Sequence, residues 1–599
     1  MDIESHNDEE SIAKNETSAW LGCYLDENSR MEDESSYFYS IREFLSRIED
    51  DSRPKRGKKK EHLTKNICVY IYNLSFEWSF ILPVLLEMGF TYGEPSDDAE
   101  MVYTSVSTKS CSSVWCASLK FGKKNGVVIL RDLAKMFPGG LGNVAEAFGL
   151  PTQKGEIDYR KNRLHGYQVT QEEKEYCFKD TRILMEILMI MNEKNDKDFW
   201  QSTSMASYSM RKLLKEGFPK SKKPYNAYRK LYPELSEEEN NFLRAGVEGG
   251  ITYPPARWQF KEITQKIGHI DKHQMHPSSA YFNPFPYGFG EYFTGKPPLG
   301  KICACHIRIS YDDVKLHSII KLIGLDFITG KEITVWDFEI PTMFKCYVNL
   351  KVEYIDGYAY HIRRLPWRKY YADNYRKRLV AKREKNKFYI LYYKLLNNSS
   401  YGKHLEKPHN KVFVNTIRAD GIIDSNIFDA EQYKANARYT YLPVGSCIPA
   451  YSRVDLIETA LKFGWEYIVY FDTDSIFFLW NEQTEKVWMS LNQEDFLGGW
   501  GWEEMIDRAQ FAAPKRYKTE TDGKAIIKAA GINFKQYRAD HGMDDDTTIP
   551  FDEVNIVSST WKVQRAYRVK GGTIIKFQEK EMDVQPKYQA IYERNAAGI

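Results

Sequence analysis

The sequence has almost no net charge, no complete zinc motif and no hydrophobic run of membrane length. Its 84 lysines and arginines nearly balance 82 aspartates and glutamates, so the formal net charge is only +2. No overall positive field therefore indicates a nucleic-acid partner, and any basic channel must be local. The nine cysteines are an odd number and widely scattered, which fits a reducing cytoplasm.

The sequence contains neither a complete zinc site nor a membrane-spanning segment. Cys303-Ala304-Cys305-His306 resembles a metal-binding fragment, but no second pair lies at zinc spacing, so we interpret these as strand residues. No apolar run approaches the roughly 18 residues of a membrane span, and Met1 is followed by acidic residues instead of a signal peptide. We therefore expect a soluble, intracellular protein with no membrane partner.

The length and the aromatic content of the chain favour a large multidomain protein. At 599 residues the chain is too long for one core, and about three to five structural units are expected. The 41 tyrosines and 32 phenylalanines are numerous. They suit surfaces on which bases stack, although large hydrophobic cores use them too.

The most informative stretch contains two aspartates separated by one residue. Runs of β-branched and aromatic residues flank Asp472-Thr473-Asp474, a pattern that predicts a β-hairpin. Side chains alternate along a strand, so Asp472 and Asp474 share a face with no lysine or arginine beside them in the sequence. Such carboxylates repel each other unless a cation lies between them. A plain turn explains one aspartate but not two, so we predict a divalent metal site.

Residues 1–195 are predicted to form an α/β unit with four carboxylates from distant segments. The first two lie on one strand face, the third opens a helix, and the fourth lies within a helix over residues 172–191. A two-metal phosphodiester hydrolase needs such a set, because one ion activates water and the other stabilises the leaving oxygen. Tyr176 lies one helical turn before the fourth acid and could orient that water. The four acids are Asp2, Glu4, Glu77 and Asp180.

A second pattern predicts a nucleotide-binding helix. The densest basic region of the chain, residues 368–387, leads into Lys394, Asn398 and Tyr401. These three residues are four and then three apart, so they project from one face of a helix. A lysine that neutralises phosphate, an amide that hydrogen-bonds and an aromatic ring that stacks form a face suited to a nucleotide.

These patterns resemble the motifs of family B DNA polymerases and occur in the same order. Residues 470–475, Tyr-Phe-Asp-Thr-Asp-Ser, resemble the third palm motif, Tyr-x-Asp-Thr-Asp-Ser. Residues 394–402 resemble motif B, Lys-x-x-x-Asn-Ser-x-Tyr-Gly, and residues 271–278 resemble motif A, Asp-x-x-Ser-Leu-Tyr-Pro-Ser. Residues 514–517 match the Lys-x-Tyr motif that holds the primer end.

The resemblance implies a polymerase site that uses two Mg²⁺ ions, with Mn²⁺ as a substitute. Asp271, Asp474 and the backbone of Lys272 would hold the metal, and Asp472 would support the site electrostatically. The implied nucleotide contacts are His276, Lys382, Lys394, Asn398 and Tyr401. Lys394, and more weakly Lys382, would neutralise charge on the leaving pyrophosphate. The implied DNA contacts in this part of the chain are Arg453, Lys515 and Tyr517.

His276 departs from motif A, where the family has a tyrosine beneath the sugar that blocks a 2′-hydroxyl. An imidazole is planar but smaller and more polar, so we expect weaker exclusion of ribonucleotides. A packed histidine at the turn before Pro277 is the alternative interpretation.

The acids of the N-terminal unit resemble the three proofreading motifs of the same family. Those motifs are Asp-x-Glu, Asn-x-x-Phe-Asp and Tyr-x-x-x-Asp, here beginning at Asp2, Asn73 and Tyr176. The resemblance implies that Asn73 and Phe76 contact DNA and that Lys154 assists a 3′–5′ exonuclease. Glu77 replaces the usual aspartate, and only Met1 precedes Asp2, so we expect a frayed strand and slow hydrolysis.

The implied fold is α/β and α+β multidomain: an RNase H-like 3′–5′ exonuclease domain and a right-hand polymerase of palm, fingers and thumb with two insertions. The second insertion would provide processivity and strand displacement. The predicted boundaries are 1–195 for the exonuclease domain, 196–299 for the palm with motif A, 300–365 for the first terminal-protein-region insertion, 366–402 for the fingers, 403–440 for the second insertion, 441–533 for the palm with motif C and 534–599 for the thumb.

Within family B the chain resembles the protein-primed polymerases of small phages with linear genomes, the phi-twenty-nine type. The short chain, the exonuclease motifs at its start and the room for two insertions indicate this type. The implied partners are primer–template DNA, dNTPs and a terminal protein, and the implied enzyme is a virus-encoded monomer in a bacterial cytoplasm. Two alternatives stay open: a family B polymerase with nucleic-acid primers or unprimed initiation from a mobile element, and a DNA-binding or exonuclease-only relative.

Overall fold

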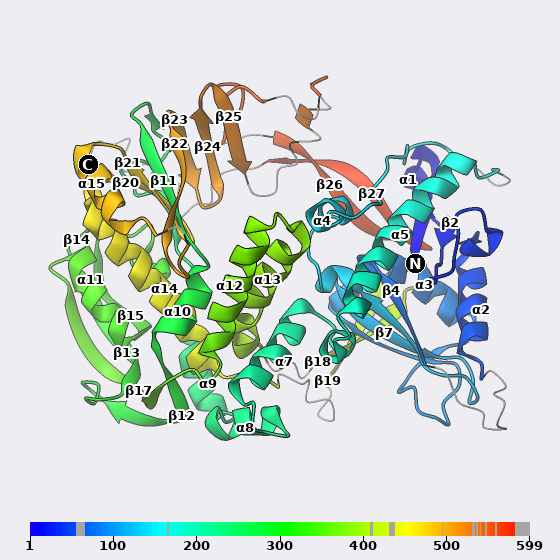
Figure 1. The fold of residues 1–599 in the computed structure, drawn as a ribbon, viewed down its shortest axis with the longest axis horizontal. Helices are drawn as coiled ribbons and strands as arrows, with labels where there is room; N and C mark the ends of the chain where they lie inside the picture. The colour runs from blue at the N-terminus through cyan, green and yellow to red at the C-terminus, as the bar shows by residue number, and fades with distance from the viewer. Residues whose placement is uncertain are drawn as a thin grey trace.

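The computed structural model describes residues 1–54, 66–163, 167–407, 411–429, 438–493, 495–529, 534, 537–538, 541–544, 548–557 and 560–581. One lobe contains the N-terminal segments, drawn in blue and cyan, and a second lobe contains most of the green, yellow and orange segments (Figure 1). Within the described residues, the helices are all too short or too polar to span a membrane.

The N-terminal lobe is a mixed sheet flanked by helices. Strands β4 and β8, at one edge of the five-stranded sheet, are parallel, and a short antiparallel sheet of β1, β2 and β3 lies beside them. Helix α5 begins at a capping box, in which the Thr170 hydroxyl accepts from Glu173 N and the Glu173 carboxylate accepts from Thr170 N. Three predicted elements of this lobe are confirmed: β1 Asp2–Ser5, α3 Leu74–Glu87 and α5 Gln171–Glu193. The bounds of the other strands named here are β2 Ala19–Cys23, β3 Tyr37–Phe38, β4 Ile67–Ile71 and β8 Val128–Asp132.

A five-stranded sheet in the second lobe contains the predicted aspartate hairpin. The strand order is β22-β11-β21-β20-β9, and the register places Asp271 directly opposite Ser475. Ile270 and Ile476 are fully buried, which anchors this register on the apolar side of the sheet. The hairpin prediction is confirmed. The strands are β9 Thr252–Tyr253, β11 Ile267–Lys272, β20 Ile468–Asp472, β21 Ser475–Leu479 and β22 Trp500–Ile506.

A four-stranded sheet and a helical pair surround this central sheet. Cys303 and Cys305 lie in strand β13 as free, buried thiols, so the interpretation of these cysteines as strand residues is confirmed. Helix α13 begins where the Asn386 side chain accepts a hydrogen bond from Tyr389 N, and it packs against α12. The bounds are β12 Pro284–Thr294, β13 Ile302–Tyr311, β15 Ile328–Trp336, β17 Lys351–Arg364, α12 Arg368–Arg383 and α13 Lys387–Ser399.

Two late hairpins connect the second lobe to the N-terminal lobe (Figure 1). Hairpin β18 Lys411–Ile417 and β19 Ile423–Asp429 contacts the N-terminal sheet, where Tyr103 donates its hydroxyl proton to the Asn415 carbonyl at 2.8 Å. Hairpin β26 Thr560–Val569 and β27 Gly572–Glu581 packs against α3, and Arg568 donates to the Ser75 carbonyl at 2.9 Å. Segments from the second half of the chain therefore complete the N-terminal lobe.

Candidate active sites

The aspartate hairpin is fixed against β11 by backbone hydrogen bonds. Thr473 has a φ of +67° at the turn, and its N–H donates to the Ile251 carbonyl at 2.9 Å. Lys272 N–H donates to the Asp474 carbonyl at 2.8 Å. Motif A and the hairpin are therefore adjacent, and the carboxyl groups of Asp271 and Asp474 share one electrostatic environment.

Burial and mutual repulsion perturb these two carboxyl groups. Burial raises the pKa of Asp271 to about 7, and the charge of Asp474 adds to the shift. Burial also raises the pKa of Asp474, with Asp472 contributing. The Ser475 hydroxyl, 3.0 Å from Asp271 Oδ2, is a neutral donor that cannot balance two charges. Such a pair fits a divalent cation, which would keep both groups ionised at neutral pH.

Asp472 has its own counterion. The Lys515 ammonium forms an ion pair with Asp472 Oδ1, and the lysine side chain is about half exposed. The expectation that no basic residue shields the aspartates is therefore wrong for Asp472, because Lys515 folds back from 43 residues further along the chain. The arrangement distinguishes Asp472, which is already paired, from Asp271 and Asp474.

The predicted nucleotide face lies next to motif A. Lys394 and Asn398 are exposed on α13, and Tyr401 follows at the end of that helix. The Tyr401 ring meets the His276 ring edge-on, with the centroids 4.9 Å apart. The adjacent Asn397 donates to the Gln274 side chain at 2.6 Å, which fastens α13 to the motif A loop.

His276 lies in α10, Met275–Phe282, with one ring nitrogen engaged by the protein. His276 Nδ1 is 2.8 Å from the Ser452 hydroxyl oxygen. Burial lowers the pKa of His276 to about 4, with Arg453 adding to the shift, so the ring is neutral at pH 7. The ring is thus both packed against protein and adjacent to the exposed face of α13.

Two predicted DNA contacts lie in the protein interior instead. The Arg453 side chain is 3% exposed, pairs with Glu339 at 2.6 Å and donates to the carbonyls of Glu248 and Gly249. The Tyr517 ring is 2% exposed and packs against Tyr470. The prediction of a DNA contact is wrong for both, because neither side chain has a surface to offer. Removing the Arg453 guanidinium would leave Glu339 buried without a counterion, at a cost of about 3–5 kcal/mol.

Sequence reasoning did not single out Arg378, although the structure places its charge near Asp271. Arg378 and Lys382 lie one turn apart on α12, and burial lowers the pKa of each. The Arg378 charge acts on Asp271, as the Lys394 charge does. The sequence signal for Arg378 was its position four residues before Lys382, which places both side chains on one face of the helix.

A cavity of about 580 Å³ in the N-terminal lobe contains the second cluster of predicted residues. Strand β1 contributes Asp2 and Glu4, α3 contributes Glu77, and α5 contributes Tyr176 and Asp180. Lys154 donates to Asp180 Oδ2 at 2.6 Å. The predicted exonuclease acids therefore converge on one cavity, together with Phe76. Asn73 instead lines a neighbouring pocket that shares Asp2, Lys154 and Asp180.

The carboxyl groups of this cavity are strongly perturbed. Burial raises the pKa of Asp2 to about 7, with Asp180 contributing, and raises the pKa values of Glu4, Glu77 and Asp180. Glu77 is 2% exposed, and its Oε2 has no hydrogen-bond partner among the described residues. A buried carboxylate oxygen without a partner is costly unless a cation binds it. The set fits divalent metal ions.

The expected fraying of the first strand is wrong. Asp2 and Glu4 are paired in register with Cys23 and Leu21 of β2, and the Met1 side chain is 4% exposed. The Met1 ammonium also donates to the Tyr70 carbonyl at 3.0 Å. Neighbours from β2 and β4 thus hold the strand, which the sequence could not indicate.

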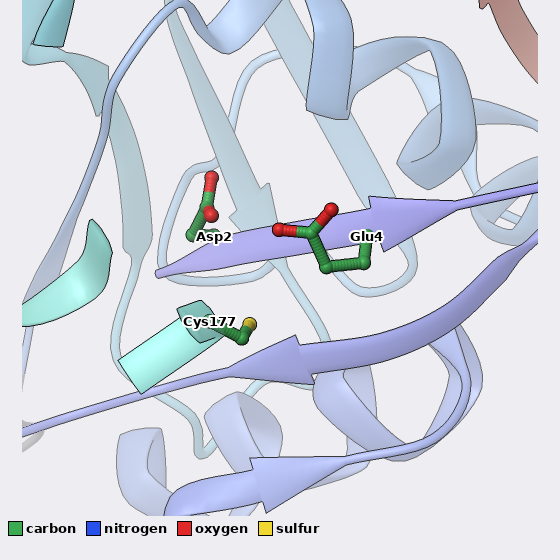
Figure 2. Close-up of side chains that lie close together, drawn as sticks. All are labelled: Asp2, Glu4 and Cys177. Carbon is green, nitrogen blue, oxygen red and sulfur yellow. The ribbon is translucent and has the colours of Figure 1, made fainter. Parts of the chain in front are cut away.

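Three features of this cavity were missed from the sequence. The Tyr159 and Tyr176 hydroxyls are 2.6 Å apart, so a second tyrosine accompanies the predicted one. Thr573 and Phe577 of hairpin β26–β27 line the cavity although they lie near the other end of the chain. Cys177 lies beside Asp2 and Glu4 on the α5 side of strand β1 (Figure 2).

Comparison with known proteins identifies the family. A family model for DNA polymerase type B, organellar and viral, matches residues 159–453. The DNA polymerase of Bacillus phage B103 is 27% identical over 538 residues, which cover 85% of this chain and 89% of that protein. The chain belongs to the type B DNA polymerases. The matched model includes Asp271 and Lys394, and the longer alignment extends the likeness over most of the chain.

Other phage proteins and solved structures agree with this family. The DNA polymerase of Streptococcus phage Cp-1 is 23% identical over 606 residues, 96% of each chain. The solved structure of Phi29 DNA polymerase complexed with primer-template DNA superimposes with a TM-score of 0.78 at 22% identity, covering 98% of this type B polymerase and 99% of that chain. This likeness confirms the predicted multidomain fold of exonuclease and polymerase parts.

Proposed function

We propose that this DNA polymerase extends primer–template DNA with dNTPs at the Asp271–Asp474 centre and edits at the cavity around Asp2 and Glu4. The observation that carries the proposal is that motif A, the aspartate hairpin and the exposed face of α13 meet at one place. Support for the substrates comes from related structures, titled as Phi29 DNA polymerase complexed with primer-template DNA and incoming nucleotide substrates. The boundaries predicted from the sequence are part of this proposal.

In the polymerase site, the residues have distinct tasks. Asp271, Asp474 and the Lys272 carbonyl would hold two Mg²⁺ ions, or Mn²⁺ in their place. When bound, the metal activates the primer 3′-hydroxyl and binds the triphosphate. Lys394, with Arg378 and Lys382, neutralises charge that develops on the leaving pyrophosphate, and Tyr401 and His276 support the base and sugar. Lys515 holds Asp472 and, being half exposed, remains a DNA contact in this proposal.

In the editing site, a water must be directed at the terminal phosphodiester. Asp2, Glu4, Glu77 and Asp180 would hold the metal pair that activates the water and stabilises the leaving oxygen. The paired hydroxyls of Tyr176 and Tyr159 orient the water, and Lys154 stabilises the charge around Asp180. Asn73 and Phe76 would guide the single-stranded 3′ end.

The proposed priming mode is a terminal protein, in a virus-encoded monomer that acts in the cytoplasm of a bacterium. Support comes from the related enzymes, which belong to phages of Bacillus and Streptococcus. The test is to incubate the enzyme with the small basic protein encoded by a neighbouring reading frame and labelled dNTPs. Covalent labelling of that protein is expected in the wild type and not in Asp474→Ala. Extension of only nucleic-acid primers would contradict protein priming and leave the polymerase assignment intact.

Replacing Lys394 by alanine should weaken both nucleotide binding and chemistry. The lost charge acts on the bound triphosphate and on the developing pyrophosphate, so we expect a higher KM, a lower kcat and a loss in kcat/KM of about 10²-fold. Single-nucleotide incorporation at varied dNTP concentration measures this. Lys377→Ala, an exposed lysine on α12, is the control. If the substitution changes only the affinity for DNA, Lys394 does not contact the nucleotide.

His276→Tyr should sharpen the selection of deoxyribonucleotides. The larger ring would occupy space available to a 2′-hydroxyl, and one well-placed steric contact is worth about 10–200-fold in discrimination. The measurement is the ratio of kcat/KM for dATP over ATP in both proteins. Because the His276 pKa is about 4, the wild-type ratio should be constant from pH 6 to 8. An unchanged ratio in the variant would show that His276 does not gate the sugar.

Polymerisation at limiting Mg²⁺ should fall as the pH drops through about 7. The pKa of Asp271 is raised to about 7, so the ionised, metal-binding form is complete above that pH and is lost below it. Higher Mg²⁺ competes with the proton and should move the midpoint to lower pH. The measurement is primer extension from pH 5.5 to 8.5 at two Mg²⁺ concentrations. If the pH midpoint of primer extension is the same at both Mg²⁺ concentrations, a group other than Asp271 causes the pH dependence.

A further inference from the structure

Cys177 brings a thiol to the carboxylates of the N-terminal cavity. The residue lies on α5, is completely buried, and faces strand β1 (Figure 2). One ligand atom each from Asp2, Glu4 and Cys177 lies within 4.8 Å of the other two. This thiol has no role in the editing chemistry proposed above, in which all ligands are oxygen atoms.

The separations suit a single metal ion after a small side-chain movement. Ligand atoms bound at about 2.0–2.3 Å around one tetrahedral Zn²⁺ lie about 3.3–3.8 Å from each other. The observed upper limit of 4.8 Å therefore requires movements of about 1 Å, which rotation of Glu4 or Asp2 provides. The backbone is already fixed, because β1 is paired with β2 and α5 packs against both strands.

An independent observation is an unpaired carboxylate oxygen in the same cavity. The Glu77 side chain is 2% exposed and lines the same cavity, and its Oε2 has no hydrogen-bond partner among the described residues. Burial raises the pKa of Glu77, and the negative charge of Asp2 adds to this shift. A buried, unpaired carboxylate oxygen next to Asp2 is a ready additional ligand.

We infer that Asp2, Glu4 and Cys177 form a mixed carboxylate–thiol site that binds a thiophilic divalent cation such as Zn²⁺ or Cd²⁺. Oxygen ligands alone suit Mg²⁺ and Mn²⁺, whereas a thiolate adds strong preference for softer ions. Binding forms one metal–sulfur bond and releases the thiol proton to solvent. The inference rests on the proposed editing function for its consequence: the thiophilic ion takes Asp2 and Glu4 from Mg²⁺ and stops hydrolysis while synthesis continues.

A neighbouring thiol defines the competing arrangement. Cys23 on β2 is opposite Asp2 in register, and its thiol lies near that of Cys177. Both cysteines also belong to a small apolar cluster with Leu21 and Tyr37. Cys177 could therefore act as buried packing alone, as free cysteines commonly do, or the two thiols could hold a soft ion without the carboxylates.

Cadmium titration of the full-length, chelator-treated enzyme separates these arrangements. Thiolate-to-metal charge-transfer absorption in the ultraviolet reports a Cd–S bond directly. We expect one equivalent of Cd²⁺ to produce the band in the wild type and in the control Cys303→Ser, which removes a buried thiol from β13. The band should disappear in Cys177→Ser and in Cys177→Ala, and primer extension confirms that both variants are folded. Persistence of the band in either variant overturns the inference.

The carboxylate half of the site needs its own variant. Asp2→Asn/Glu4→Gln should weaken Cd²⁺ binding by about tenfold or more, since even loss of a supporting group costs 10–100-fold. Undiminished affinity would show a thiol-only site at Cys23 and Cys177 and overturn the mixed site. In parallel, Zn²⁺ should inhibit Mg²⁺-dependent hydrolysis of single-stranded DNA at about tenfold lower concentration in the wild type than in Cys177→Ser. If Mg²⁺ alone supports no hydrolysis, the editing function fails while the cadmium result still decides the metal site.

Discussion

Asp271→Ala and Asp474→Ala should each abolish nucleotide addition and leave DNA binding intact. The two carboxyl groups share one environment, and the pKa of Asp271 is raised to about 7 by burial and by Asp474. Removing either group leaves too little negative charge to hold two divalent ions. We expect primer extension to fall by on the order of 10³-fold or more, the scale of losing a principal charge-stabilising group in phosphoryl transfer.

The same variants should bind primer–template DNA at least as well as the wild type. Each substitution removes a negative charge near the proposed DNA path, and neither aspartate is a positive group that could contact phosphate. Fluorescence anisotropy at fixed salt measures this binding. Glu482→Ala is a suitable control, because Glu482 is an exposed acid that pairs with Lys486 on the surface of α15, Glu482–Leu491. Near-normal extension by either aspartate variant would refute the polymerase assignment of this centre.

The polymerase elements were predictable where short-range patterns determine the geometry. The spacing of Lys394 and Asn398 places both on one face of a helix, and both are exposed on α13. The alternation around Asp472 and Asp474 likewise defines a hairpin, observed as β20 and β21. These arrangements depend on residues within about one or two turns or strands, which a sequence displays directly.

Predictions failed where a distant partner determines the environment. Arg453 was predicted to contact DNA from its place in the sequence, but its guanidinium is buried and pairs with Glu339, 114 residues away. Asp472 lacks a basic neighbour in the sequence, yet Lys515 pairs with it. A local pattern specifies the type of side chain, whereas burial and ion pairing depend on which segments pack together.

The N-terminal cavity shows the same limitation more strongly. Each acid could be named from the sequence, but the walls of the cavity include Thr573 and Phe577 from β26–β27. Strand β1 is stabilised by β2 and by contact with β4, so the position of Asp2 near the chain start does not loosen it. The resemblance to exonuclease motifs therefore identified the acids, whereas only the tertiary structure shows that their strand is held in place.

The second large effect concerns this cavity: Asp2→Ala/Glu4→Ala should eliminate 3′–5′ degradation of single-stranded DNA. Glu4 is buried and Asp2 is partly buried, both beside Asp180, and without them the remaining acids cannot hold a metal pair that activates water. We expect a decrease of on the order of 10³-fold or more in hydrolysis, with primer extension changed by no more than about twofold. The measurement is release of labelled nucleotides in Mg²⁺.

Two further variants make the editing result specific. Glu9→Ala/Glu10→Ala removes two exposed acids from α1, Glu9–Lys14, a few residues further along the chain, and should degrade DNA at the wild-type rate. Glu77→Asp should degrade DNA faster, because the shorter side chain restores the carboxylate position typical of the motif. Because the strand is held in register, any slow hydrolysis by the wild type should come from the extra methylene of Glu77. Degradation that persists in Asp2→Ala/Glu4→Ala would place the editing site elsewhere.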